Sequence, residues 1–126
     1  MVLVLDTNCL ANLEFLRWLK DSGEESYLPA VAYMEAFYHT LKRKRSTEMF
    51  RSALAAAAIK VYPFTPDQAE AAAGAAVGRW DFARNARDYA IGSVALLEKA
   101  TMVTENKKDF AWLPQVKSPR EAMEAA

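Results

Sequence analysis

The sequence predicts an α/β protein with a central parallel sheet, and three observations lead to that prediction. The first is the unbroken apolar run at residues 2–5, which is typical of a strand buried on both faces. The second is the alternation of short apolar segments with longer segments of helical periodicity along the chain. The third is the composition, since 126 residues with 52% hydrophobic and 25% charged side chains indicate one globular domain, residues 1–126. Strands that alternate with helices favour right-handed crossovers, which place helices on both faces of the sheet.

The first half of the chain is predicted to form three strands and three helices. Apolar residues recur at helical spacing from Leu10 to Leu19, and Asn8 is a candidate cap for this helix. Pro29 suits the first position of the second helix, Ser46 opens the third, and Pro63 closes the third strand. The predicted elements are strand 2–5, helix 10–19, strand 26–28, helix 29–42, helix 47–58 and strand 59–62.

The second half is predicted to form three helices, a helical turn and two short strands. Thr65 before Pro66 is a cap followed by a first-position proline, and Ser118 before Pro119 repeats the pattern near the end of the chain. The predicted helix at residues 85–99 has a buried stripe that includes Ile91. The predicted elements are helix 66–80, helix 85–99, strand 101–104, helical turn 107–113, edge strand 116–117 and a helix from 119.

Charge and cysteine content exclude several classes of protein. Sixteen basic residues balance sixteen acidic ones, so any nucleic acid must be bound by a local patch and not by an overall positive field. The single cysteine, Cys9, cannot form an intrachain disulfide, which fits a reducing compartment. No signal peptide opens the chain and no apolar run reaches membrane-spanning length, so we expect a soluble cytoplasmic protein without membrane contact.

Three carboxylates lie on elements that are otherwise predicted to be buried. Asp6 follows the first strand at the sheet edge where α/β proteins bind ligands. Glu35 is the acidic exception in a nearly all-apolar helix, and Asp88 shares a helix face with Ile91. Grouped buried carboxylates repel one another unless a cation joins them, and oxygen ligands suit Mg²⁺ or Mn²⁺. The alternatives are that each acid pairs with a nearby Arg or Lys, or that Asp6 only caps a helix.

Four motifs, in this order, resemble those of the PIN-domain ribonucleases, in particular the VapC-type toxins of prokaryotic toxin–antitoxin pairs. They are Leu5-Asp6-Thr7-Asn8, Glu35 in the second helix, Arg87-Asp88-Tyr89-Ala90-Ile91, and Val103-Thr104-Glu105-Asn106-Lys107-Lys108-Asp109-Phe110. The resemblance spans the whole chain and implies a PIN-like three-layer α/β/α sandwich with a five-stranded parallel sheet. It also implies endonuclease action on RNA with Mg²⁺ or Mn²⁺, a homodimer, and an antitoxin protein as partner.

The resemblance assigns roles to individual residues. It implies that Asp6, Glu35 and Asp88 are metal ligands and that Asn106 is the fourth catalytic residue. The family often has aspartate at the position of Asn106, so the loss of that charge should weaken a second metal. Residues that would orient the ligands or a water from a second layer are Thr7, Asn8, Thr104 and Asp109.

Cationic residues give two candidate paths for RNA. Lys42, Arg43, Lys44 and Arg45 form the densest basic run, although such a run is also expected as a solvated helix end. Arg84 and Arg87 lie close in sequence to Asp88 and form a second candidate group, with Arg79 nearby. We expect the only histidine, His39, to be structural.

Two other functions remain open from the sequence. The first is a PIN-like binding module, weakened at Asn106, that acts through protein or RNA contacts. The second is an aspartyl-phosphate phosphohydrolase with Asp6 as nucleophile, although such enzymes place a second aspartate two residues later and this chain has Asn8 there.

Overall fold

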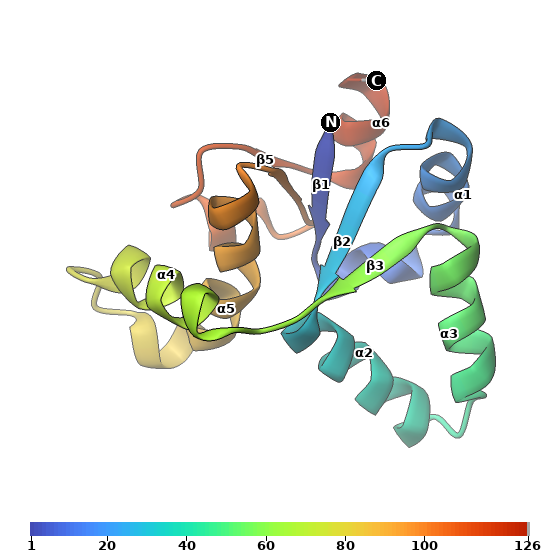
Figure 1. Cartoon of the computed structure of the whole chain (residues 1–126), viewed down its shortest axis with the longest axis horizontal. Helices are drawn as coiled ribbons and strands as arrows, with labels where there is room; N and C mark the ends of the chain where they lie inside the picture. The colour runs from blue at the N-terminus through green and yellow to red at the C-terminus, as the bar shows by residue number, and fades with distance from the viewer. Residues whose placement is uncertain (126) are drawn as a thin grey trace.

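The computed structural model describes residues 1–125 and contains a five-stranded sheet in which all strand pairs are parallel (Figure 1). The strand order is β3-β2-β1-β4-β5, so the first strand of the chain lies at the centre. The predicted parallel sheet is therefore confirmed. The strands are β1 (Val2–Leu5), β2 (Glu25–Pro29), β3 (Ile59–Tyr62), β4 (Thr101–Val103) and β5 (Val116–Lys117).

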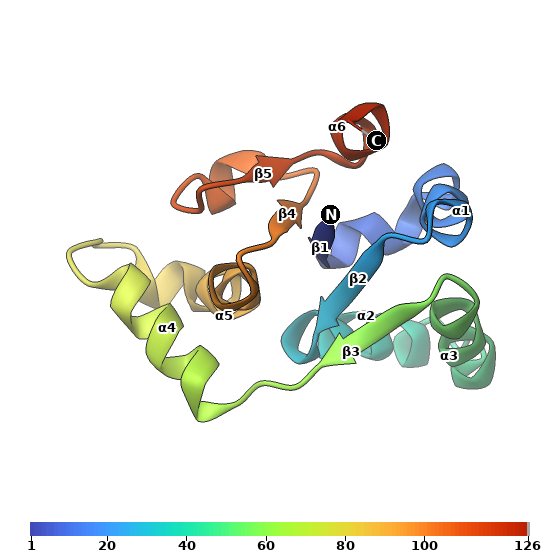
Figure 2. The same cartoon turned by 45° about the horizontal axis from the view of Figure 1, so that its top comes forward.

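Helices cover both faces of this sheet, which gives the predicted three layers. Figure 2 shows α4 and α5 on one side of the strands and α1, α3 and α6 on the other. Within residues 1–125, none of the helices has the length and apolarity needed to cross a bilayer. The helices are α1 (Leu13–Ser22), α2 (Ala30–Lys42), α3 (Thr47–Ala56), α4 (Pro66–Ala76), α5 (Phe82–Glu98) and α6 (Pro119–Ala125), with short 3₁₀ helices η1 (Thr7–Ala11) and η2 (Lys107–Phe110).

The central strand β1 anchors the core. Leu3, Val4 and Leu5 are each 0% exposed, because β1 pairs with a neighbour along both edges and is covered on both faces. Helix α5 contacts β1, and its Ile91 and Val94 belong to the same buried cluster. The apolar run at residues 2–5 therefore fixes both the middle of the sheet and the helix packed on it.

The turn after β1 is capped differently from the prediction. Asn12, not Asn8, caps α1, since its side chain accepts a hydrogen bond from the backbone N–H of Phe15 at 3.0 Å. Asp6 caps η1 by accepting from the N–H of Thr7 at 2.8 Å. A short 3₁₀ helix thus separates the strand from the α-helix, and the side chain of Asn8 is free to reach toward Thr104.

Several predicted helix limits were wrong, among them both limits of α1, which spans Leu13–Ser22 and not residues 10–19. Helix α4 ends at Ala76 and not at residue 80, because Gly78 takes a left-handed conformation with φ of +84°. Helix α3 ends at Ala56, and Ala58 is left-handed with φ of +57°. Helix α5 begins at Phe82, three residues before the predicted start, and the backbone of Asn85 is not helical, so the regular part follows that kink.

Gly92 allows α5 to approach the segment after η2. A Cβ atom built on Gly92 would lie 2.6 Å from Cζ2 of Trp112 and 3.2 Å from Cδ1 of Leu113. The Trp112 ring in turn packs on Tyr89, with ring centroids 4.9 Å apart. The absence of a side chain at Gly92 therefore fixes how closely α5 and the residues that follow β4 approach each other.

We expect Gly92→Ala to destabilise the protein by about 1–3 kcal/mol, because the new methyl group displaces a packed indole ring. Gly74→Ala is the matched control, since Gly74 also lies in a helix and a Cβ there would meet nothing within 4 Å. That control should gain up to about 1 kcal/mol from helix propensity. Urea denaturation of both variants gives the two free energies of unfolding, and equal changes in the two would contradict the packing argument.

Candidate functional site

Three acidic side chains from distant parts of the chain converge at the carboxyl edge of the sheet. Asp6 directly follows β1, Glu35 lies in the second turn of α2, and Asp88 lies in α5 just after its kink. Asp6 is only 2% exposed. The sequence-predicted acids are therefore brought together in space.

The guanidinium of Arg87 joins all three carboxylates. Its Nε donates to Oε2 of Glu35 at 2.5 Å, and its Nη1 donates to Oδ1 of Asp88 at 2.6 Å. Its Nη2 donates to Oε1 of Glu35 at 2.7 Å, and to Oδ1 of Asp6 and Oγ1 of Thr7 at 3.2 Å each. Three carboxylates face one guanidinium, so the cluster keeps an excess of negative charge. We call these four residues, Asp6, Glu35, Asp88 and Arg87, the acid cluster.

Hydrogen bonds from neighbouring turns hold Asp6 in one orientation. The hydroxyl of Thr104 donates to Oδ2 of Asp6 at 2.9 Å, and Nδ2 of Asn8 approaches the same oxygen at 3.4 Å. Asn8 also accepts from the backbone N–H of Glu105 at 3.2 Å. These contacts tie the turn after β1 to the turn after β4, so the carboxylate of Asp6 has little freedom to rotate.

The segment after β4 contributes charge through Asp109 and a backbone contact through Asn106. The side chain of Asn106 is exposed, and its backbone N–H donates to the hydroxyl of Thr104 at 3.0 Å. Asp109, in η2, lies close enough to Asp88 to raise the pKa of that carboxyl. The sequence motif thus delivers an acidic side chain to the edge of the cluster from a position three residues after Asn106.

Two of the three carboxyls that share Arg87, Glu35 and Asp88, have pKa values shifted in opposite directions. The two hydrogen bonds from Arg87 lower the pKa of Glu35 below its usual value and outweigh partial burial. Burial raises the pKa of Asp88 above its usual value, the positive charge of Arg87 opposes this effect only in part, and the charges of Asp109 and Asp6 add to it. The side chain of Asp88 is 13% exposed and that of Glu35 is 30% exposed, which accounts for the stronger effect of burial on Asp88.

Arg87 is bound to the cluster more tightly than its sequence position suggested. Burial lowers its pKa, but the hydrogen bonds to Glu35 and the charges of Asp6, Glu35 and Asp88 raise it well above the usual range. Sequence analysis placed Arg87 among the RNA-binding cations. In the structure, each guanidinium nitrogen already donates to an acidic residue of the same chain, so contact with RNA would require the side chain to leave the cluster.

The carboxylates suit a divalent cation chemically, although their present spacing suits a guanidinium. Oxygen donors that converge on one positive group are the ligands that Mg²⁺ and Mn²⁺ prefer. In residues 1–125, however, no three acidic, histidine or cysteine side chains are arranged to hold a metal ion. A metal ion and the guanidinium of Arg87 would therefore be alternatives for the same carboxylates.

The other predicted cations lie in different surroundings. Lys42 lies over the ring of Tyr38 at 5.8 Å, and Arg84 lies over the ring of Trp80 at 5.9 Å. Arg43 and Arg45 line a cavity beside η1. His39 lines the same cavity, and sequence analysis missed this because a lone histidine on an apolar helix has no motif around it.

Cys9 does not provide a nucleophile. Its side chain is 0% exposed, its thiol donates to the carbonyl of Val103 at 3.1 Å, and burial raises the pKa of the thiol. A buried protonated thiol is unreactive, which leaves the acid cluster as the chemically distinctive feature of this edge.

Comparisons with known proteins identify the family and the fold of this chain. The family model of the PIN domain matches residues 3–114. No curated protein matches the sequence. A toxin-antitoxin complex from Klebsiella pneumoniae has a similar fold, with a TM-score of 0.70 and 24% identity over 94% of this chain and 98% of that chain.

Two further solved structures are similar in fold. One is VapBC2 from Rickettsia felis bound to a DNA fragment from its promoter, with a TM-score of 0.65 and 20% identity over 94% of this chain and 98% of that chain. The other is DNA-bound VapBC from Salmonella typhimurium, with a TM-score of 0.63 and 19% identity over 94% and 97% of the two chains.

The opposite pKa shifts predict opposite effects on stability. In metal-free protein at neutral pH, Glu35→Gln should lower the free energy of unfolding, by on the order of 1 kcal/mol after allowance for solvent screening. Asp88→Asn should leave it unchanged or raise it, because the fold disfavours the charged form of Asp88.

The pH dependence follows from the same signs. The stabilisation from ionised Glu35 is present above its usual pKa and is lost as the pH falls through its lowered folded pKa, while the cost of ionised Asp88 disappears as the pH falls below its raised folded pKa. The difference for Asp88→Asn should therefore disappear as the pH falls toward about 4, whereas the difference for Glu35→Gln should shrink only below about pH 4. Chemical denaturation across this pH range measures them, and a Gln variant more stable than the Asn variant at pH 7 would refute the assignment.

Proposed function

This chain belongs to the PIN domain family, and we propose that it is a metal-dependent endoribonuclease that acts as the toxin of a VapBC-type toxin–antitoxin pair. The observation that carries this proposal is the convergence of Asp6, Glu35 and Asp88 on one positive group at the carboxyl edge of the sheet. Like charges repel, so acids separated by dozens of residues gather at one point only where a cation stabilises them, as Arg87 does in this structure. A site that binds a cation explains why they do.

Asp6, Glu35 and Asp88 would hold Mg²⁺ or Mn²⁺. When bound, such an ion supplies an activated water and a positive charge for the phosphate under attack. The chain contributes the orientation of its ligands: Thr104 and the N–H of Thr7 fix the two oxygens of Asp6, which is nearly inaccessible to solvent. Asp109, rather than the amide of Asn106, adds negative charge beside Asp88.

A protein partner belongs to the proposal because the similar structures from Klebsiella, Rickettsia and Salmonella are toxin–antitoxin or VapBC assemblies. The surface of α2 supports it, since Met34, Tyr38 and Leu41 are each more than half exposed along one side of the helix. Tyr33 and Phe37 face inward and pack with Phe50 of α3. A homodimer or antitoxin contact on α2 would therefore use the exposed side chains of Met34, Tyr38 and Leu41. A nuclease that acts on cellular RNA would work in the cytoplasm, and this location is part of the proposal.

A binding module is the second candidate function, and the Arg87 network is the observation that favours it. The guanidinium neutralises part of the cluster, as a structural salt bridge would. An aspartyl-phosphate mechanism receives less support, because Asp6 is 2% exposed and its carboxylate already accepts hydrogen bonds on both oxygens. Activity measurements separate the nuclease from the binding module.

We expect Asp6→Asn, Glu35→Gln and Asp88→Asn each to reduce Mn²⁺-dependent cleavage of RNA by about 100-fold or more, because each removes a charge that would hold the ion. Glu70→Gln is the matched control, since Glu70 is exposed on α4 away from the cluster. Initial rates with a fluorescent RNA substrate measure the effect, and circular dichroism checks the fold. Undiminished cleavage by any of the three variants would remove that residue from the mechanism.

Arg87→Met should increase Mn²⁺ affinity by about 10-fold, because the ion would no longer compete with a guanidinium for the same carboxylates. The metal-free variant should be less stable than the parent protein, since the three acids lose their shared counter-charge. Arg87→Lys keeps a positive charge and serves as the control. Isothermal titration with Mn²⁺ measures the affinity in the absence of RNA, and an unchanged or weaker affinity of the Met variant would place the ion away from Arg87.

A further inference from the structure

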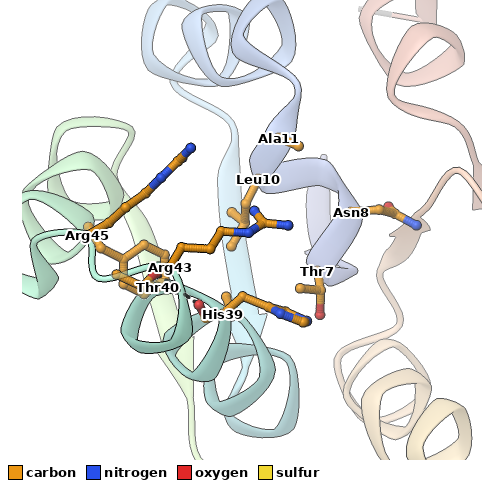
Figure 3. A pocket seen from close by; sticks show the side chains of 10 residues that line it. Thr7, Asn8, Leu10, Ala11, His39, Thr40, Arg43 and Arg45 are labelled. Carbon is orange, nitrogen blue, oxygen red and sulfur yellow. Dashed lines mark hydrogen bonds between the residues drawn. The ribbon is translucent and has the colours of Figure 1, made fainter.

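A cavity of about 400 Å³ opens directly beside the acid cluster. It lies between η1, the C-terminal half of α2 and the start of α3, and Thr7 and Asn8 form the wall that it shares with the cluster. Its volume falls in the range of pockets for small organic ligands, about 300–1,000 Å³. Figure 3 shows the side chains of Arg43 and His39 extended toward the η1 segment that carries Thr7.

The lining of this cavity combines two kinds of surface. Leu10 and Phe50 provide an apolar wall, together with the small side chains of Ala11 and Ala36. The rest of the lining consists of polar or cationic groups, namely Thr7, Asn8, His39, Thr40, Arg43 and Arg45. A ligand that fits such a cavity has a flat apolar part and a negatively charged part.

The arginines of this cavity have no acidic partner in the part of the chain that the structure describes. Among the ion pairs within residues 1–125, none includes Arg43 or Arg45. Arg87, by contrast, is bound by three acids. In a chain with no net charge, these two guanidinium groups form a local positive site that is available to an anion.

The turn after α2 directs these two arginines to the cavity. Lys44 is left-handed, with φ of +54°, and the N–H groups of Lys44 and Arg45 donate to the carbonyls of Leu41 and Thr40 at 3.0 Å each. These two bonds form a Schellman motif, which ends the helix and reverses the chain. The basic run is therefore divided: Arg43 and Arg45 line the cavity, whereas Lys42 lies over Tyr38 and Lys44 occupies the turn.

One face of α2 links the cavity to the acid cluster. Glu35, His39 and Arg43 are spaced four residues apart and so lie along one side of the helix. His39 lies close enough to Glu35 to add a small effect to the lowered pKa of that carboxyl, whose main cause is the hydrogen bonding from Arg87. A ligand in the cavity would thus lie directly beside the acids and not at a separate site.

We propose that this cavity holds one nucleotide of a single-stranded RNA, next to the phosphodiester presented to the acid cluster. Arg43 and Arg45 bind its phosphate, and the base packs on the wall formed by Leu10 and Phe50. This proposal rests on the proposed nuclease function. A nucleotide fits better than a free inorganic anion, since an anion alone would leave the apolar wall without a partner.

The test measures binding without cleavage, using a short fluorescein-labelled single-stranded RNA in EDTA. Arg43→Ala/Arg45→Ala should weaken binding by about 10-fold and flatten the slope of log affinity against log salt by roughly 1.4, that is, 0.7 for each lost contact. Lys42→Gln/Lys44→Gly is the matched control, because it removes the same charge and glycine suits the left-handed turn. The control should keep the salt dependence of the parent protein. An equal loss of RNA affinity in both double variants would overturn the proposal of a nucleotide subsite.

Two further measurements identify the occupant. An RNA with abasic sites should bind the parent protein several-fold more weakly, and equal binding would overturn the assignment of a base to the apolar wall. Inorganic phosphate alone should compete only weakly. If an acidic peptide bound in an Arg43- and Arg45-dependent manner while RNA did not bind, the occupant would be a protein segment and the proposal would be wrong.

Kinetics separate a failure of this inference from a failure of the proposed function. With Mn²⁺, Arg43→Ala/Arg45→Ala should raise KM by about 10-fold and leave kcat within about threefold, because the arginines hold RNA and do not touch the acids. A loss of kcat at unchanged KM would contradict the subsite while leaving the nuclease intact. RNA binding that depends on Arg43 and Arg45, in a protein that cleaves nothing, would support the subsite and reject the nuclease.

Discussion

The contact on which this edge of the molecule depends is the guanidinium of Arg87 between three carboxylates. Asp6, Glu35 and Asp88 come from the end of β1, from α2 and from α5, and without a shared cation their charges would drive these elements apart. Arg87 makes the arrangement stable by a bidentate contact to Glu35 and single contacts to the other two. The same contact would compete with a metal ion, because Arg87 already occupies the space between the three carboxylates where such an ion would bind.

The parallel sheet explains why the acids can meet at all. Strands β1 and β4 are parallel neighbours in the middle of the sheet, so the turns that follow them lie at the same edge. A hydrogen bond from Thr104 to Asp6 joins these two turns. Helix α5 packs on β1, with Ile91 in the shared buried cluster, and this packing holds Asp88, one turn before Ile91, at that edge. The apolar core therefore supplies the free energy that holds an excess of negative charge in place, which packing of the cluster alone could not do.

The sequence predicted the order of elements, the parallel sheet and the grouping of the acids, because each depends on periodicity or on a residue at the end of a strand. It could not predict the role of Arg87, since adjacency to Asp88 in sequence says nothing about reach toward Glu35, fifty-two residues away. Helix ends were wrong where alanine continues a helical pattern past the true stop at Gly78. The basic run was treated as one unit, because a left-handed lysine in a Schellman turn has no sequence signal comparable to glycine.

The distribution of charge along α2 connects the acid cluster with the cavity beside η1. Glu35 and Arg43 change the sign of one helix face from negative to positive over two turns, and Arg43 lies at the C-terminus of α2, where the helix dipole favours a cation. A polyanionic strand laid along this face would meet attraction at Arg43 and repulsion at Glu35 unless a divalent cation intervened at the acids. In the proposed nuclease, RNA and metal should therefore favour each other's binding, because the ion would remove the repulsion that the strand meets at one end while the arginines would hold it at the other. A chain with zero net charge can in this way bind a polyanion at one place and leave the rest of its surface neutral to nucleic acid.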